Sequence, residues 1–240
     1  MTGFRLDHHN RIWELLSRLD GALLQRSDCY FGGGTAIVLE NDEYRLSRDV
    51  DFLCSSSEGY RTLREATFGS GIAGLFVQPI NELKTTRRDR YGIRTVVEIE
   101  GVPIQFEIVR EDRIKLSGAI DDSYGVPVLD CISQFAEKLL ANADRAVDRS
   151  SMNRDAIDLG MLVRNHSEIP DEAVEEAVLA YGGDIGRSAR IACEMLASET
   201  RVREVATEMS MDVDVVRAAR NSFLSEVDRI WPVPAGVPVP

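Results

Sequence analysis

The sequence predicts a mixed α+β domain followed by a helical domain, and three observations lead to this prediction. Helical and strand patterns alternate up to about residue 125. From about residue 128 onward, one helical pattern follows another, and the last stretch of the chain is rich in proline. We therefore expect an α/β domain over residues 1–125, a helical domain over 126–230 and a Pro-rich tail over 231–240.

The elements of the first domain follow from the spacing of apolar residues. Helical spacing predicts helices over residues 11–24, 35–39 and 58–66. Apolar runs or alternation predict strands over residues 29–31, 49–54, 94–100 and 102–109. Gly101 separates the last two strands, which is typical of a tight hairpin turn. These strands are expected to share one mixed sheet that helices flank.

The second domain contains only helical patterns. They cover residues 128–145, 154–165, 170–181, 186–197, 199–209 and 212–228. Pro170 is suited to the start of a helix because it lacks only an N–H group that would have no partner there. The glycines at 182 and 183 end the same helix.

The composition narrows the class of protein. The formal net charge is −12 over 240 residues, which argues against a general coat for nucleic acid, since the phosphate backbone would repel it. No apolar run approaches the roughly 20 residues that cross a bilayer, and residues 1–9 lack the apolar stretch of a signal peptide. We therefore expect a cytoplasmic protein with no membrane partner. The four cysteines are scattered without a zinc-binding spacing.

Two aspartates on one predicted strand carry the main chemical signal. In Asp49-Val50-Asp51, both carboxylates should point to the same face because side chains alternate along a strand. Two such close charges repel unless a divalent cation lies between them, and Mg²⁺ (or Mn²⁺) prefers carboxylate oxygens and substrate phosphates. Glu107 on a later strand would add a third carboxylate to a two-metal arrangement. The alternatives are a solvated strand face for the aspartates and an exposed edge position for Glu107.

The glycines at 32–34 lie between a predicted strand and a predicted helix. Such glycines allow backbone N–H groups to approach a phosphate, and a helix N-terminus favours negative charge. Together with the two aspartates and the later carboxylate, they are typical of a nucleotidyltransferase fold.

The residues next to the glycines and the aspartates make this motif more specific. Gly-Gly-Thr-Ala at 33–36 is followed by Arg-Leu-Ser-Arg-Asp-Val-Asp at 45–51. This string resembles the AbiEii/AbiGii toxin family, whose members read Gly-Gly-Thr-Ala and then Arg-x-Ser-x-Asp-hydrophobic-Asp. The resemblance implies a nucleotidyltransferase-like mixed sheet followed by a helical lobe. It assigns nucleotide binding to Gly33, Gly34, Thr35, Arg45 and Ser47.

The family resemblance also implies a second cluster in the helical half. Lys138 and Asp155 match the lysine and the aspartate that join the active site from the second lobe. Lys138 would contact a nucleotide phosphate, and Asp155 could position the acceptor hydroxyl or help remove its proton. Asp158 lies three residues after Asp155, on the same helix face, and is a possible acceptor contact. The alternative is an ordinary surface helix with salt bridges.

A basic patch is the best candidate for an RNA backbone or a triphosphate. Its members are Lys84, Arg87, Arg88 and Arg90, with Tyr91 and Arg94 nearby. The alternative is a solvated strand edge formed with Asp89 and Glu98, since charged edges prevent aggregation.

The resemblance implies an enzyme that transfers a nucleotidyl group from an NTP to an acceptor with the help of Mg²⁺. The expected acceptor is RNA, at a tRNA 3′ end, and the expected role is that of a toxin restrained by a cognate antitoxin. Two alternatives stay open. The acceptor could be a small molecule or a protein hydroxyl, or the chain could be a non-catalytic module that binds a nucleotide or an antitoxin.

Overall fold

The computed structural model describes residues 3–232 of the chain. It consists of two compact units, Met1–Gln134 and Phe135–Pro240, and the division falls within one long helix. The predicted boundary at residue 125 lies nine residues before the observed one, at Gln134. The predicted Pro-rich tail lies, apart from Trp231 and Pro232, outside the described residues.

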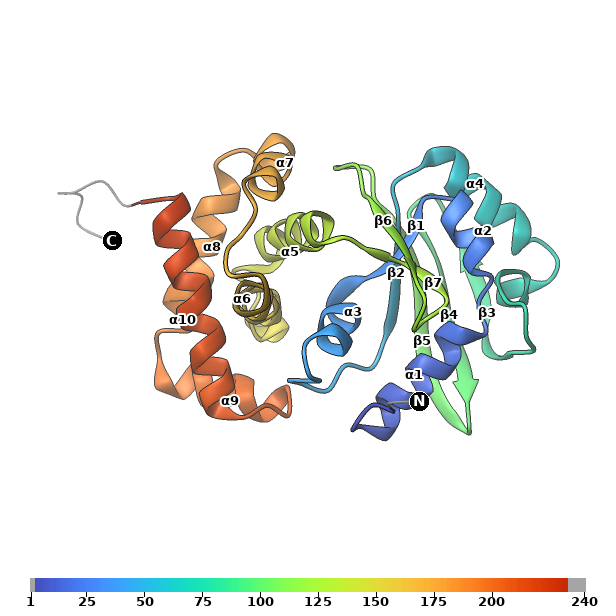
Figure 1. Cartoon of the computed structure of the whole chain (residues 1–240), viewed down its shortest axis with the longest axis horizontal. Helices are drawn as coiled ribbons and strands as arrows, with labels where there is room; N and C mark the ends of the chain where they lie inside the picture. The colour runs from blue at the N-terminus through green and yellow to red at the C-terminus, as the bar shows by residue number, and fades with distance from the viewer. Residues whose placement is uncertain (1–2, 233–240) are drawn as a thin grey trace. The chain divides into compact units, whose positions relative to one another are not determined.

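The first unit combines a sheet with helices (Figure 1). Its helices are α1 (Asp7–Ser17), α2 (Gly21–Arg26), α3 (Gly33–Glu40), α4 (Ser57–Ala66) and the short 3₁₀ helix η1 (Gly71–Leu75). Its strands are β1 (Cys29–Gly32), β2 (Val50–Cys54), β3 (Asn81–Arg88), β4 (Gly92–Ile99), β5 (Val102–Arg110), β6 (Gly118–Asp121) and β7 (Val126–Leu129).

These strands form one mixed sheet in the order β3-β4-β5-β2-β1-β7-β6. Strand β2 pairs with β1 in antiparallel and with β5 in parallel orientation, and β1 also pairs with β7 in parallel. The hairpins β3–β4, β4–β5 and β6–β7 are antiparallel. The predicted mixed sheet flanked by helices is thus confirmed.

Side chains along β2 point alternately into the core and to the opposite face of the sheet. Val50, Phe52 and Cys54 are fully buried, and the Phe52 ring lies 5.6 Å from the ring of Phe31 and 5.8 Å from that of Phe106 between ring centres. Apolar side chains of α1, α2 and α4 belong to the same core cluster. Burying each large apolar side chain contributes roughly 1.5–3 kcal/mol, so this face holds the sheet in register.

The structure corrects the helix predicted over residues 11–24, which is two helices. The carboxylate of Asp20 accepts a hydrogen bond from the Leu23 N–H at 2.8 Å and begins α2, while the Asp20 N–H donates to the Leu75 carbonyl at 2.9 Å. Leu19 forms an isolated bridge with Phe76. Apolar spacing could not reveal this break because the leucines on both sides of it are buried.

Three strands of the sheet, β3, β6 and β7, are absent from the sequence prediction. β3 is an edge strand with mostly exposed polar side chains, so it lacks the alternation that identifies a half-buried strand. β7 is buried at all four positions, and the helix predicted over 128–145 includes its last two residues, because periodicity does not distinguish so short an apolar run from a buried helix. The hairpin at Gly101 is confirmed, with positive φ angles of 49° at Glu100 and 77° at Gly101.

The second unit is helical, as predicted (Figure 1). Its helices are most of α5 (Cys131–Arg145), then α6 (Arg154–His166), α7 (Asp171–Tyr181), α8 (Asp184–Met195), α9 (Glu199–Glu208) and α10 (Val213–Ile230), with a 3₁₀ turn η2 (Arg149–Ser151). Helix α10 packs along α6. The two helices are in tight contact at Gly160, where an added Cβ atom would lie 2.0 Å from the Ala219 carbonyl oxygen.

We predict that Gly160→Ala destabilises the protein by about 1–3 kcal/mol, because the new methyl group meets backbone that cannot move aside. Gly183→Ala is the matched control, since nothing lies within 4 Å of the position of its added Cβ. The control should change the free energy of unfolding by no more than about 1 kcal/mol. Urea unfolding of both variants measures the difference, and equal stabilities would contradict the tight α6–α10 contact.

Candidate active site

The two aspartates of the motif lie where a loop enters the sheet. β2 begins at Val50, so Asp49 is the last residue of the loop and Asp51 is the second residue of the strand. The prediction placed both on the strand; only Asp51 has its direction set by the pleat. Asp49 is exposed and Asp51 is half-buried, so both are polar groups at the edge of solvent.

A row of polar residues crosses four strands in register. Asp51 on β2 pairs with Glu107 on β5, Glu107 with Arg94 on β4, and Arg94 with Arg87 on β3. Register partners point to the same face of a sheet, so this row lies on the face opposite Phe52. At about 4.8 Å per strand, the row spans roughly 14 Å from the aspartate to Arg87. This face of the sheet is therefore acidic at Asp51 and basic at Arg87.

Gly33 brings the backbone close to Asp51. It is the first residue of α3 and has a φ of 66°, and a Cβ atom added there would lie 2.8 Å from a carboxylate oxygen of Asp51. A side chain would therefore collide with the aspartate. The first N–H groups of a helix lack intrahelical partners and favour anions, so α3 presents its positive end next to the carboxylate.

Three predicted nucleotide-binding residues, Thr35 on α3 and Arg45 and Ser47 in the loop between α3 and β2, form hydrogen bonds with one another. The hydroxyl of Thr35 donates to the carbonyl of Asp49 at 2.6 Å and lies 2.7 Å from the hydroxyl of Ser47. Arg45 donates to the same Ser47 hydroxyl at 3.2 Å. All three side chains are buried, with Thr35 only 1% exposed. In this structure they hold the loop that leads to Asp49.

Two further residues hold this loop, and the sequence motif did not identify them. The buried imidazole of His9 accepts a hydrogen bond from the Ser47 N–H at 3.1 Å, and its other nitrogen lies 2.8 Å from the carboxylate of Glu43. His8 bonds to the Arg48 carbonyl at 3.1 Å. Nothing in the residue pattern links positions 9 and 43, because the contact depends on how α1 packs.

The carboxylates fit a divalent cation only together with a substrate. Within residues 3–232, no group of three or more His, Cys, Asp or Glu side chains is arranged to hold a metal ion by itself. Glu107 accepts a hydrogen bond at 2.5 Å from Arg94, which also lies 3.4 Å from Asp89. Mg²⁺ is commonly bound through one or two carboxylates plus substrate phosphates, so Asp49 and Asp51 suffice for that mode of binding.

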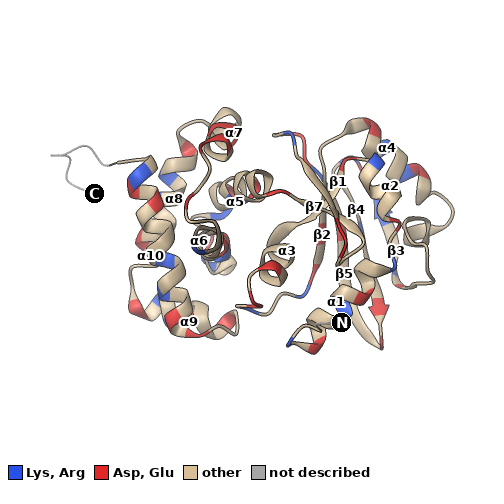
Figure 2. Ribbon diagram, in the orientation of Figure 1, with Lys and Arg blue, Asp and Glu red and all other residues tan. Residues whose placement is uncertain are grey.

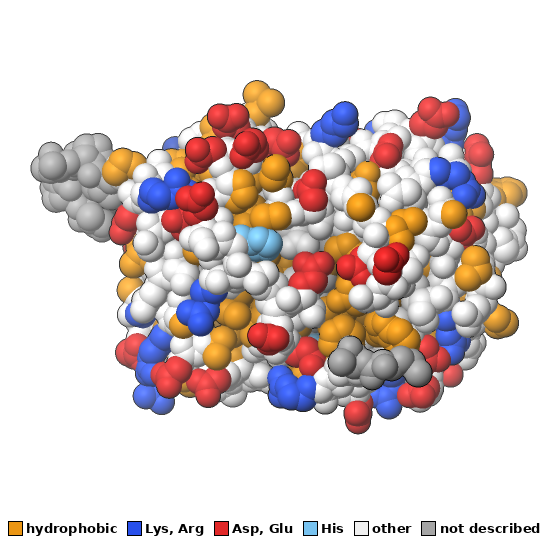
Figure 3. All heavy atoms as spheres, viewed as in Figure 1, with side chains coloured by type: hydrophobic (Ala, Val, Ile, Leu, Met, Phe, Trp, Pro, Cys, Tyr) orange, Lys and Arg blue, Asp and Glu red, His pale blue; other side chains and the backbone are white. Residues whose placement is uncertain are grey.

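The predicted basic patch divides into two parts. Lys84 and Arg87 are exposed, and both pair with β4 residues of the polar face. Among the described residues, neither has a carboxylate partner. Arg88 instead donates to the carbonyl of Thr67 and lies over the Phe68 ring, and Arg90 lies over the ring of Tyr91. In Figure 2 the ribbon is blue at the positions of Lys and Arg, including those on α4. Elsewhere both signs are interspersed on the face seen in Figure 3.

The predicted cluster of the second unit is a buried group of ion pairs. The ammonium of Lys138 on α5 lies 3.1 Å from Asp155 and 2.9 Å from Asp158, both on α6. Arg145 donates to both oxygens of Asp155 at 2.9 Å. Asp155 and Asp158 are almost completely buried, so the surface-helix alternative does not describe them. Asp158, predicted as a possible acceptor contact, holds Lys138.

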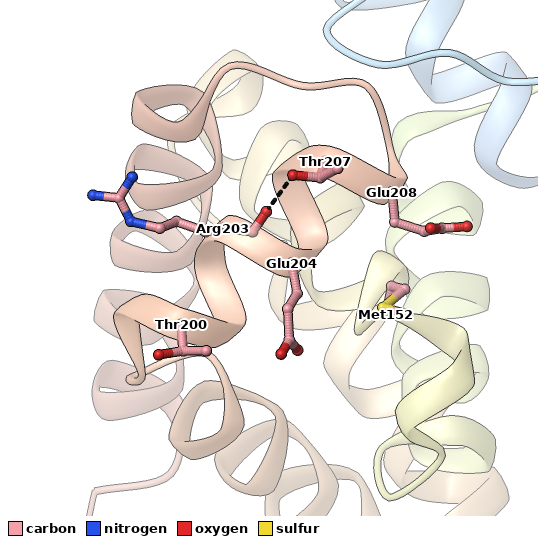
Figure 4. A pocket seen from close by; sticks show the side chains of 6 residues that line it. All are labelled: Met152, Thr200, Arg203, Glu204, Thr207 and Glu208. Atoms are coloured by element: carbon pink, nitrogen blue, oxygen red, sulfur yellow. Dashed lines mark hydrogen bonds between the residues drawn. The ribbon is translucent and has the colours of Figure 1, made fainter.

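A shallow pocket on the second unit does not contain these residues. It has a volume of about 530 Å³. Figure 4 shows the side chains that line it, which are Met152, Thr200, Arg203, Glu204, Thr207 and Glu208. The Thr207 hydroxyl donates to the carbonyl of Arg203 at 2.9 Å, within its own helix. With mixed charges and no converging polar groups, this pocket does not have the features of an active site.

Comparison with solved structures places the fold among the nucleotidyltransferases. A putative nucleotidyltransferase from Helicobacter pylori is similar with a TM-score of 0.53 at 13% identity, over 92% of this chain and 94% of that one. JHP933 from Helicobacter pylori is similar with a TM-score of 0.50 at 15% identity, over 95% of each chain. No curated protein matches the chain significantly.

The family follows from the sequence match. Residues 14–231 match the model of the family described as nucleotidyl transferase AbiEii toxin, type IV toxin–antitoxin system. The chain belongs to this family, which confirms the resemblance seen at residues 33–51. It is a nucleotidyltransferase of the toxin class. In the part of the chain that the structure describes, no helix is both long and apolar enough to span a membrane.

We predict that Gly33→Ala abolishes nucleotidyl transfer, because its methyl group would displace the Asp51 carboxylate. Gly101→Ala is the control, since Gly101 also has a positive φ, of 77°, but nothing within 4 Å of its added Cβ. Both variants bear the left-handed conformational cost of about 1–2 kcal/mol, and only the first disturbs the site. Thermal unfolding and initial rates measured together separate the two effects. Equal activities would contradict the contact with Asp51.

Proposed function

We propose that the protein transfers a nucleotidyl group from an NTP to the 3′ end of an RNA, with tRNA as the expected acceptor, and that a cognate antitoxin restrains it. The observation that carries this proposal is the in-register row from Asp51 to Arg87 on one face of the sheet. The acidic end suits a cation and a triphosphate. The basic end suits a phosphate backbone that approaches along the same face.

The reaction forms a bond from the acceptor hydroxyl oxygen to the α-phosphorus and breaks the bond from that phosphorus to the β-phosphate oxygen. Pyrophosphate leaves, and the hydroxyl proton passes to a base. A divalent cation bound to Asp49 and Asp51 would supply charge stabilisation to the phosphoryl oxygens. The first N–H groups of α3, near Gly33 and Gly34, would bind the phosphates. Thr35, Arg45 and Ser47 would act by fixing the loop.

Lys138 and Asp155 enter the proposal through the family resemblance. Because Arg145 and Lys138 already bond to the carboxylate of Asp155, we assign it the role of holding Lys138 instead of accepting a proton. Lys138→Ala would leave two buried carboxylates without their ammonium partner, which costs about 3–5 kcal/mol. Lost activity in that variant would not separate folding from catalysis, so Asp49 and Asp51 are better first targets.

We predict that Asp49→Asn and Asp51→Asn each reduce transfer by about 10²- to 10³-fold, the range for losing one electrostatic group at a transition state. Each change keeps the size of the side chain and removes its charge. The protein is incubated with Mg²⁺, total RNA and each α-labelled NTP in turn. Asp122→Asn, an exposed aspartate of the same unit, is the control. Full transfer by Asp49→Asn contradicts the proposal. Labelled protein in place of labelled RNA would indicate a protein hydroxyl as the acceptor.

We predict that Arg87→Ala weakens RNA binding and lowers the slope of log affinity against log salt by about 0.7, the loss of one phosphate contact to a single strand. Arg203→Ala, which removes an exposed arginine of the pocket on α9, should leave the slope unchanged. Fluorescence anisotropy with total tRNA at several salt concentrations measures both. If Arg87→Ala keeps the wild-type slope, RNA does not follow the basic end of the row.

A further inference from the structure

The loop between α3 and β2 is attached to α1 through two adjacent histidines. His8 bonds to the carbonyl of Arg48 and His9 to the N–H of Ser47, so consecutive residues of the loop are bound by consecutive residues of the helix. The two loop residues that are bound in this way, Ser47 and Arg48, directly precede Asp49. The match to the family begins at residue 14, and neither histidine is part of it.

The hydrogen bonds of His9 fix its tautomer. Because the Ser47 N–H donates to Nε2, that nitrogen must carry a lone pair, and Nδ1 must carry the proton that it donates to Glu43. The carboxylate of Glu43 also accepts from the N–H groups of Arg5, at 2.5 Å, and Leu6, at 2.9 Å, just before α1. Its orientation is therefore determined by the backbone.

The environment of His9 favours the neutral ring. Burial lowers the pKa of His9 below its ordinary value of 6.5. The charged groups around it act in opposite directions, since the Glu43 carboxylate raises this pKa and His8 lowers it. A lowered pKa means that the neutral contact contributes stability above about pH 6.5 and loses it as the pH falls. A proton on Nε2 would then face the N–H of Ser47, and two donors cannot share one hydrogen bond.

Any displacement of Ser47 reaches Asp49 through a short path. The Ser47 hydroxyl lies 2.7 Å from that of Thr35, which donates to the Asp49 carbonyl at 2.6 Å. We propose that His9 is a positioning residue, which in its neutral Nδ1–H form holds the loop so that Asp49 is placed for nucleotidyl transfer, and that protonation of His9 releases the loop. The catalytic part rests on the proposed role of Asp49; the tautomer and the loop contact do not.

The first test is nitrogen NMR of the full chain labelled with ¹⁵N-histidine. The chain has three histidines, so the spectra of His8→Gln and His166→Gln identify the signals of His9. We expect His9 to show a protonated Nδ1 and an unprotonated Nε2 at neutral pH. As it titrates, hydrogen exchange at Ser47 should become faster than the intrinsic pH dependence explains. The proposal is overturned if His9 carries its proton on Nε2, or if hydrogen exchange at the Ser47 amide does not change as His9 titrates.

The second test is the pH profile of label transfer. His9→Gln should lower kcat by roughly 10- to 100-fold at neutral pH, the range for a small misplacement of a catalytic group, and should remove the loss of activity associated with His9 on the acid side. Glu43→Gln, which removes the charge that favours the imidazolium, should move the acid loss to lower pH. His166→Gln is the matched control and should keep the wild-type profile.

The two tests fail separately. If His9→Gln does not fold, the wild-type NMR titration and the Glu43→Gln profile still decide the proposal. If neither His9→Gln nor Glu43→Gln changes the loss of activity at acid pH, the proposal is contradicted. If the wild-type protein transfers no label to any acceptor, the proposed acceptor is wrong, while the tautomer and the exchange at Ser47 still show whether His9 holds the loop.

Discussion

Strand β2 is hydrogen-bonded on both sides, antiparallel to β1 and parallel to β5, and this double pairing determines where the polar groups of the site lie. It places Gly32 opposite Asp51 on one side and Glu107 opposite it on the other. A slip of one residue would turn Phe52 out of the core and Asp51 into it. Because Phe52 is fully buried between two other rings, the register of the core also fixes the position of the carboxylate.

The loop that precedes β2 has no such ladder, and buried side-chain hydrogen bonds take its place. Asp42 and Glu43 both adopt positive φ angles, of 55° and 49°, which is unfavourable for residues with side chains. Thr35, Ser47 and His9 are buried there, and each would cost free energy without a partner. Their mutual bonds offset that cost and give the loop one conformation. Helix α1 thus contributes to the site although it carries no catalytic group.

Features that depend on neighbours in sequence were predictable, and those that depend on packing were not. The glycines, the Asp-x-Asp pair and the Gly101 hairpin are local, and each lies where the pattern placed it or within a residue of that position. The contact of His9 with Glu43 joins residues 34 positions apart, and no periodicity encodes it. The sequence did not predict edge strand β3, because its side chains are mostly exposed and polar and so give no apolar alternation. Phosphate contacts by Thr35 and Ser47 stay predictions, and in the structure their hydroxyls bond to each other, with that of Thr35 also donating to the Asp49 carbonyl.

The charges of the second unit set a limit on what Lys138 can do. Lys138 and Arg145 face Asp155 and Asp158, so the formal charge of these four side chains is zero. Buried charges persist only in such paired groups, because each one alone would lose its hydration without compensation. A neutral group gives no net attraction to a triphosphate, which carries several negative charges. Lys138 therefore adds no net positive charge to its surroundings, and its ammonium group is held by two buried carboxylates. In the first unit, the N-terminus of α3 and the cation proposed to bind Asp49 and Asp51 are the groups expected to offset the charge of a triphosphate.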